Sequence, residues 1–276
     1  MACSRGSAPP LARPGPEEVA AIAVRAAASA QVFVDDVTHP VLSSDDAHHL
    51  GRVLRLRAGE EVIVSDGVGH WARTRWNAGG GADALETLRE GSGPGGEGSV
   101  QFEPAPHPAL TVAFAPTKGE RPEWVVQKLT ELGIDRIVPL VSERSVVRWH
   151  GARGTGAVVR LRRVAREAAG QCRRVWLPEI SDVRNFSELA DLGLPGEVGL
   201  AQLSGDRLSP SQLVVAVGPE GGWSGGELAS GLPTVGFGLS VLRAETAAVT
   251  AGALMVSLRT GSVAPMAQQA PMGESS

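Results

Sequence analysis

Short apolar runs separated by turn residues characterise residues 31–77. The runs lie at 32–34, 61–65 and 71–76. Asp66 and Gly67 separate the last two runs, as in strands that are joined by a tight turn. Residues 48–57 place apolar side chains at helical spacing and predict a short helix. We therefore expect a small β-rich domain over residues 31–104.

Continuous apolar runs that alternate with helix-like segments begin at Leu110, after a connector that is rich in proline. The runs lie at 110–115, 137–141, 198–201, 213–217 and 234–237, and the helix-like segments start near 122, 157, 224 and 245. Runs without alternation are typical of strands buried on both faces. Alternation of strand with helix predicts a parallel sheet covered on both faces. The fold class that we expect over residues 108–260 is therefore α/β.

Three segments fall outside these patterns. Residues 1–30 hold six consecutive apolar positions before Arg25, fewer than the roughly 7–15 of a secretory signal, and predict a disordered extension. Residues 79–98 contain eight glycines and predict a flexible loop. We expect residues 261–276 to form a disordered tail.

Composition excludes several classes of protein. Two cysteines are too few for a disulfide scaffold or a thiolate zinc site, which favours a cytoplasmic protein. Runs of roughly 18 apolar residues, which a membrane-spanning helix needs, are missing from the sequence. Aromatic residues make up 4% and none is Tyr, which argues against a sheet that stacks bases. His48 and His49 are adjacent and point apart, so we expect no metal site.

Candidate chemistry is concentrated in two glycine-containing segments, 217–227 and 236–246. In each, an apolar run ends at glycines, and ligands of α/β proteins bind at that end of a strand. The first segment lacks the spacing of a dinucleotide or P-loop motif, and a structural turn is as good an interpretation as a binding loop. In the second, Arg243 precedes a helix start that its charge disfavours, which indicates an anionic or carbonyl partner.

Together, these two segments resemble the RsmE family of 16S ribosomal RNA methyltransferases, within the SPOUT (trefoil-knot) superfamily. Further matching segments are 49–55, 65–67, 127–133, 142–145 and 167–173. The similarity extends from about residue 31 to 260 in the family's order. It implies a small PUA-like β-barrel that binds RNA, followed by a SPOUT methyltransferase domain. It also implies a homodimer that acts on 16S rRNA of the small ribosomal subunit.

The resemblance implies S-adenosyl-L-methionine as cofactor, held by three loops at 200–203, 218–222 and 237–243. The implied cofactor-binding residues are Leu200, Gln202, Leu203, Gly218, Pro219, Glu220, Gly221, Gly222, Phe237, Gly238, Val241, Leu242 and Arg243. The implied reaction is transfer of a methyl group to N3 of one uridine.

The catalytic candidates are Arg243 and Glu245. Uracil N3 carries a proton and is a poor nucleophile until that proton leaves. An arginine that faces a uracil carbonyl stabilises the developing anion, and we assign this role to Arg243. Glu245 either orients Arg243 or accepts the proton, and the sequence leaves the identity of the base open.

Arginines are concentrated between residues 144 and 174, although the formal net charge of the chain is −4. This segment holds nine arginines and one acid, Glu167, and predicts a surface that binds phosphates. A solvated helix face is the alternative. The RNA-binding candidates are Arg144, Arg160, Arg163, Arg166 and Arg173, with Arg52 and Arg55 as a second patch.

Two other functions remain open at this point. One is a ribosome-assembly factor that binds RNA without catalysis, and the other is a SPOUT methyltransferase that acts on a different RNA position. Because both loops of the cofactor motif are intact, we favour the catalytic function.

Overall fold

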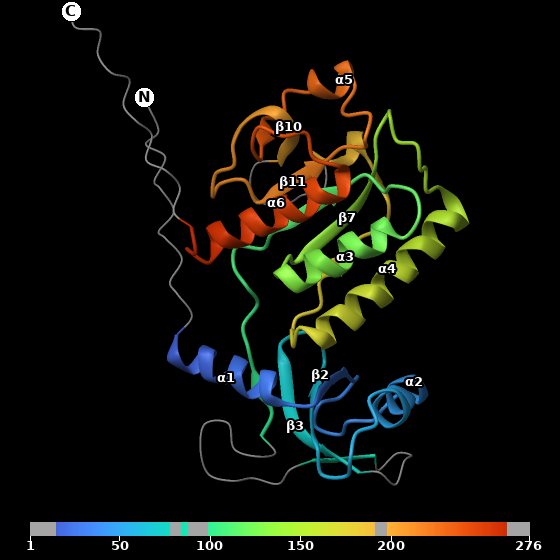
Figure 1. Cartoon of the computed structure of the whole chain (residues 1–276), viewed down its shortest axis with the longest axis vertical. Helices are drawn as coiled ribbons and strands as arrows, with labels where there is room; N and C mark the ends of the chain where they lie inside the picture. Colours follow the sequence, from blue (N-terminus) through green and yellow to red (C-terminus); the bar gives the residue numbers. More distant parts are fainter. Residues whose placement is uncertain (1–14, 78–83, 88–98, 191–197, 264–276) are drawn as a thin grey trace, which may run out of the picture.

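The computed structural model describes residues 15–77, 84–87, 99–190 and 198–263, which form two sheets with helices around them (Figure 1). The smaller sheet contains β1 (Ala30–Phe33), β2 (Glu61–Ser65), β3 (His70–Trp76), β4 (Leu85–Thr87) and β5 (Gln101–Phe102). Its strand order is β1-β2-β3-β4, and β5 pairs with β3. β1 and β2 run parallel, whereas the other pairs are antiparallel. The β-rich domain predicted from residues 31–77 is present, with α2 (Ser44–His48) and a π-helix (His49–Val53) between β1 and β2.

The larger sheet is parallel throughout. It contains β6 (Thr111–Phe114), β7 (Arg136–Val141), β8 (Glu179–Ile180), β9 (Arg184–Asn185), β10 (Val198–Arg207), β11 (Val214–Val217) and β12 (Thr234–Gly236). The order is β12-β10-β11-β6-β7-β8, and β9 pairs with β7. The five apolar runs after Leu110 all become strands, and β6, β11 and most of β7 are buried.

Three long helices cover one face of this sheet: α3 (Arg121–Leu132), α4 (Gly151–Gln171) and α6 (Ala244–Arg259) (Figure 1). α3 lies between the other two and contacts both, and their apolar side chains share one core with β6, β7 and β11. The opposite face is covered by shorter pieces, namely the 3₁₀ turn at Phe186–Glu188 and the segment around α5 (Gly225–Leu228), which supplies Trp223 and Leu232. Both faces are therefore covered, as expected, but long helices cover only one of them.

The chain segment that follows α4 joins the two sheets. The backbone N–H of Gly69 donates to the carbonyl of Val175 at 3.1 Å, and the N–H of Leu177 donates to that of Gly67 at 2.9 Å. The indole N–H of Trp176 donates to the carbonyl of Glu103 at 2.8 Å. Backbone bonds of this kind fix the small domain against the end of α4, toward which Figure 1 shows it lying.

The disorder predicted for residues 1–30 is wrong from residue 16 onward, because α1 spans Pro16–Ala27 and leads directly into β1. Proline at the helix start and acidic residues in the first turn favour this helix. Residues 1–14, 264–276 and most of the glycine loop at 79–98 lie outside the described residues, while 85–87 of that loop form β4. Among the helices that the structure describes, none is long and apolar enough to cross a membrane.

Arg25 explains why α1 is ordered. Its side chain is 4% exposed, lies 2.7 Å from a carboxylate oxygen of Glu103, and stacks over the ring of Trp71 at 5.1 Å. Its Nε donates to the carbonyl of Arg173 at 3.2 Å. Arg25 therefore connects α1, the small sheet and the chain that follows α4.

Replacing this side chain tests the connection. Arg25→Ala leaves the carboxylate of Glu103 without its partner, and the expected loss is about 2–3 kcal/mol of unfolding free energy. That is less than the roughly 3–5 kcal/mol of a fully buried pair, because Glu103 stays 23% exposed. Chemical denaturation measures this loss. Arg163→Ala, which breaks an exposed pair with Glu167, is the control and should cost less than about 1 kcal/mol. Equal losses in the two variants would contradict the role of Arg25.

Candidate functional site

A pocket of about 190 Å³ opens beside the ends of β11 and β12 and the middle of β10. Three separate segments between residues 201 and 247 line it, and two of them follow parallel strands, which bring their carboxyl ends to one edge of a sheet. The lining residues are Ala201, Gln202, Leu203, Val217, Gly218, Pro219, Glu220, Gly222, Trp223, Phe237, Gly238, Ser240, Val241, Leu242, Ala244 and Ala247. Backbone and apolar side chains dominate this wall, which suits a ligand with a large apolar surface and a few polar groups.

The glycine turn at 218–222 packs closely against Trp223. A Cβ on Gly218 would come within 3.0 Å of the Trp223 ring, so a side chain at position 218 would displace the indole. The indole N–H donates to the carbonyl of Ala201 at 3.0 Å and thereby ties the first loop of the pocket to the second. Gly222 has φ +68°, a left-handed conformation that favours glycine. The obstacle to a side chain at 222 is this backbone angle, because a Cβ there would meet no other atom within 4 Å.

The capping box predicted for Ser224 and Glu227 is present. A carboxylate oxygen of Glu227 accepts the backbone N–H of Ser224 at 2.8 Å, and the Ser224 hydroxyl accepts that of Glu227 at 3.2 Å. The other Glu227 oxygen accepts the backbone N–H of Glu143 at 2.9 Å, and Arg144 donates to the carbonyl of Gly221 at 3.1 Å. The loop after β7 and the glycine turn therefore support each other.

The first loop of the pocket arises from an irregular strand. β10 pairs with β12 on both sides of a register shift between Ala201 and Asp206, so the strand bulges outward over the intervening residues. A Cβ on Gly205 would come within 2.4 Å of the Val235 backbone, and this close contact requires glycine. The sequence predicted a strand over 198–201, whereas β10 continues to Arg207.

The third loop exposes apolar side chains beside the pocket. Leu239 is fully exposed and Val241 is 84% exposed, while Leu203 of the first loop is 51% exposed. Singly exposed apolar residues are ordinary, but several around one pocket indicate a surface that a ligand or a second protein covers.

Most of the predicted cofactor-binding residues line the pocket, and three do not. Leu200 is fully buried beneath it, and Gly221 and Arg243 lie outside the lining. Ala201 and Ser240 lie inside the predicted loops but were not named individually, and the lining residues outside those loops are Val217, Trp223, Ala244 and Ala247. Trp223 had a usable signal, since it follows the glycine turn directly, and Ala244 and Ala247 fall one helical turn apart.

The two catalytic candidates differ in their surroundings. Arg243 is the N-cap residue of α6 and is exposed, and its side chain makes no hydrogen bond or ion pair with the part of the chain that the structure describes. Glu245 is 13% exposed and lies 3.6 Å from Nε of Arg121, the first residue of α3. Arg121 in turn donates to Glu220 of the glycine turn at 3.0 Å.

The arginine cluster is more engaged with the protein than the sequence indicated. Arg173 donates to the carbonyls of Ala28 and Gly170, and Arg166 donates to the carbonyl of Phe33 at 2.6 Å. Both therefore help to hold the two domains together, and their assignment to RNA binding stays a prediction.

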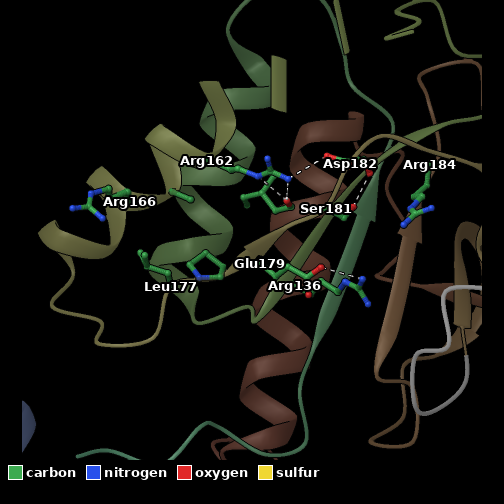
Figure 2. Close-up of a pocket in the computed structure, with 11 residues that line it drawn as sticks. Arg136, Arg162, Arg166, Leu177, Glu179, Ser181, Asp182 and Arg184 are labelled. Atoms are coloured by element: carbon green, nitrogen blue, oxygen red, sulfur yellow. Dashed lines mark hydrogen bonds and ion pairs between the residues drawn. The ribbon is translucent and has the colours of Figure 1, made fainter. Parts of the chain in front are cut away.

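The acids that balance this cluster come from elements outside it. Glu123 of α3 pairs with Arg160, and Asp182 lies 3.2 Å from Arg162 in a hollow beside α4 (Figure 2). In Figure 2 the same hollow shows Glu179 of β8 pointing to Arg136 of β7 at 3.1 Å. The local charge of this surface is thus lower than a count along residues 144–174 suggests.

Arg52, Arg55 and Arg163 stay exposed, as a phosphate-binding role requires. Arg55 has φ +54°, an uncommon backbone angle for a residue with a side chain. Among the described residues no group of three His, Cys, Asp or Glu side chains could hold a metal ion. Cys172 is a free thiol whose pKa is raised by burial, which suits a packing role and lowers its reactivity.

Comparisons with known proteins agree with this architecture. A family model described as "RNA methyltransferase domain" matches residues 103–256, and one described as "RNA methyltransferase PUA domain" matches 42–75. The chain is 34% identical over 230 residues to Ribosomal RNA small subunit methyltransferase E of Synechocystis, covering 76% of this chain and 70% of that protein. For the protein of the same name from Mycobacterium bovis, identity is 33% over 228 residues, with coverages of 76% and 83%.

A solved structure shows the same fold. It is the Ribosomal RNA small subunit methyltransferase E of Neisseria gonorrhoeae bound to S-adenosyl methionine, with a TM-score of 0.66 and 24% identity over 83% of this chain and 97% of that one. The predicted fold class, a SPOUT parallel-sheet domain preceded by a PUA-like domain, is confirmed. The chain belongs to the RsmE family of RNA methyltransferases.

Proposed function

We propose that this protein transfers a methyl group from S-adenosyl-L-methionine to N3 of a uridine in 16S rRNA of the small ribosomal subunit. The observation that carries the proposal is the pocket beside the ends of β11 and β12 and the middle of β10, which gathers the three segments of the family resemblance in one place. Relatives named Ribosomal RNA small subunit methyltransferase E support the substrate, and the Neisseria structure bound to S-adenosyl methionine supports the cofactor. We also propose a cytoplasmic location, which the ribosomal RNA substrate supports.

The residues of the pocket fit this cofactor. The turn at 218–222 offers backbone without side chains in the way, and Phe237, Val241 and Leu242 provide apolar surface for a flat ring. Gln202 brings an amide that both donates and accepts hydrogen bonds. When bound, the cofactor supplies an electrophilic methyl group on a positively charged sulfur.

The chain's own residues must orient the uracil and help its N3 proton to leave. Arg243 is exposed at the start of α6, next to the pocket residues Leu242 and Ala244, so its guanidinium can reach a uracil carbonyl. Positive charge at that carbonyl favours the anion that forms when N3 loses its proton. Glu245, one residue beyond Ala244, supplies a carboxylate that can accept that proton.

We assign the RNA surface to the exposed arginines on both domains: Arg52, Arg55, Arg144, Arg160 and Arg163. They lie on the small domain, on the loop after β7 and on α4, so a bound RNA would span both domains. Exposed arginines contribute to affinity mainly by neutralising phosphates.

We also assign a homodimer to the protein. Leu203, Leu239 and Val241 expose apolar surface beside the pocket, and the small side chains of Ala247 and Ala253 on α6 are partly exposed. Covering this surface with a second copy would remove it from water and shield the pocket. Sedimentation should show a dimer, and a fully active monomer would contradict this assignment.

Gly222→Val tests the cofactor pocket. A β-branched residue at φ +68° is strained, so the turn must change shape, and we expect affinity for S-adenosylmethionine to fall at least about tenfold. Titration calorimetry measures this. Gly231→Val, at φ +83° with no atom near its Cβ, imposes the same backbone strain outside the pocket and is the matched control. Unchanged affinity in a folded Gly222→Val protein would remove this turn from the site.

Replacing Arg52, Arg55 and Arg163 together by Gln tests the RNA surface. Each lost phosphate contact lowers the slope of log affinity against log salt by about 0.7–0.9, so we expect a total change of about 2–3. Filter binding at several salt concentrations measures the slope. Arg184→Gln, which breaks a pair with Glu188 at the edge of the sheet, should leave it unchanged. An unaltered slope in the triple variant would mean that these arginines are only solvated.

Arg243→Ala tests the reaction itself. We expect the rate of methylation to fall about 10²-fold or more, which is the loss typical of removing one preorganised electrostatic group. The affinity for the cofactor should stay nearly unchanged. Nucleoside mass spectrometry of 16S rRNA from cells that lack the protein should show the loss of 3-methyluridine. The wild-type gene should restore it and Arg243→Ala should not. Retention of 3-methyluridine in the deletion strain would contradict the proposed function, and restoration by Arg243→Ala would contradict only the role of Arg243.

A further inference from the structure

Arg121 is the side chain through which the glycine turn contacts the catalytic helix. It starts α3 and follows the loop that leaves the central strand β6. Its Nη1 donates to Oε1 of Glu220 in the turn at 3.0 Å, and its Nε lies 3.6 Å from Oε1 of Glu245 in the first turn of α6. One guanidinium thus faces two carboxylates that belong to different segments of the site.

An arginine is not expected at this position on local grounds. The N-terminal end of a helix carries partial positive charge, which disfavours a cation there. The N-cap residue of α3, Glu120, makes no side-chain capping bond, so Arg121 does not belong to a capping interaction. The two facing carboxylates offset this unfavourable position, and Arg is better suited than Lys to bridge two acceptors because its planar group presents several donors.

The two carboxylate oxygens of Glu245 differ in their contacts. Oε1 faces Arg121, whereas Oε2 is buried and has no hydrogen-bond partner among the residues that the structure describes. A buried carboxylate oxygen without a donor is costly, and such atoms in native proteins call for an explanation. A donor that arrives with the substrate, such as the N3–H of a uracil, would satisfy it.

The geometry points to Arg121 as a positioning residue for methyl transfer. Arg121 holds one oxygen of Glu245 so that the other stays available to the substrate, and its bond to Glu220 makes this arrangement depend on the shape of the cofactor turn. Arg121 need not touch cofactor or uracil to do so. The inference rests on the proposed function, and in particular on a role for Glu245 in accepting the N3 proton.

A double-mutant cycle between Arg121 and Glu245 tests this inference. With the full-length protein, S-adenosylmethionine and small-subunit rRNA, we expect Arg121→Met to lower kcat about tenfold, part of the roughly 10²–10⁴-fold that a positioned acid–base group contributes. KM for the cofactor should change less than about twofold, because the pocket wall remains. Arg121→Lys keeps the charge and should recover part of the rate.

The decisive comparison uses a Glu245→Gln background. If Arg121 acts through Glu245, then Arg121→Met should lower kcat less than about twofold in this background. The effects of two substitutions are not additive when the residues act as one unit. Lys128→Met on the same helix, which breaks an exposed pair with Glu131 at 2.8 Å, is the matched control and should leave kcat unchanged. Thermal unfolding of every variant identifies any that does not fold. If Arg121→Met does not fold, Arg121→Lys replaces it in the cycle.

Three results would overturn the inference while leaving the proposed function in place. They are full kcat in Glu245→Gln, full kcat in Arg121→Met, and a tenfold loss that recurs in the Glu245→Gln background. Wild-type protein that leaves small-subunit rRNA unmethylated would instead contradict the proposed function. The two failures are therefore distinguished by the wild-type measurement.

Discussion

Parallel pairing of β11 with β10 on one side and β6 on the other determines where the chemistry of this molecule lies. Because these strands run the same way, the segments that follow them emerge at one edge of the sheet. The glycine turn follows β11, and the start of α3 lies beyond β6. For this reason the start of α3 at Arg121 lies beside the glycine turn at 218–222, although about a hundred residues separate the two along the chain.

Side-chain hydrogen bonds and ion pairs then hold the loops at this edge of the sheet in place. Trp223 ties the first pocket loop to the glycine turn, Glu227 ties the loop after β7 to α5, and Arg121 connects the turn to α6. At the contact between the domains, the buried Arg25 and the half-buried Arg173 hold the two domains together. Arginine thus connects separate segments of this chain as well as providing exposed charge, and the exposed Arg166 does both.

The sequence predicted the parts of this structure that local pattern controls. Apolar runs gave β2 at its observed bounds and β11 within a residue, and the capping box at Ser224 formed as expected. The two- and three-residue strands β4, β5, β8 and β9 were missed because so few residues show no period. α1 was missed although Pro16 and the acidic first turn are local signals for it, because the contact of Arg25 with the distant Glu103 that anchors the helix lies outside any local window. The domain boundaries drawn from the proline connector stay predictions.

In the candidate site, too, local sequence patterns predicted some residues, whereas tertiary contacts determine the others. Residues on the glycine turn and on the loop before α6 were predicted from sequence, whereas Ala201, Trp223 and Arg121 acquire their places only through the parallel sheet. The count of arginines over residues 144–174 overstated the positive charge of this surface. It omits the acids that other elements bring to the cluster, such as Glu123 and Asp182. Electrostatic surfaces depend on tertiary neighbours more than helices and strands do.

The central claim is that the pocket beside β10 and the ends of β11 and β12 holds the methyl donor. A crystal structure of this protein with S-adenosylmethionine tests it most directly. The account predicts the ligand between Gln202, Gly218 and Leu242, with its methyl group open toward the side of Arg243 and Glu245. A ligand bound elsewhere on the molecule, or turned so that its methyl group faces away from these two residues, would contradict the account.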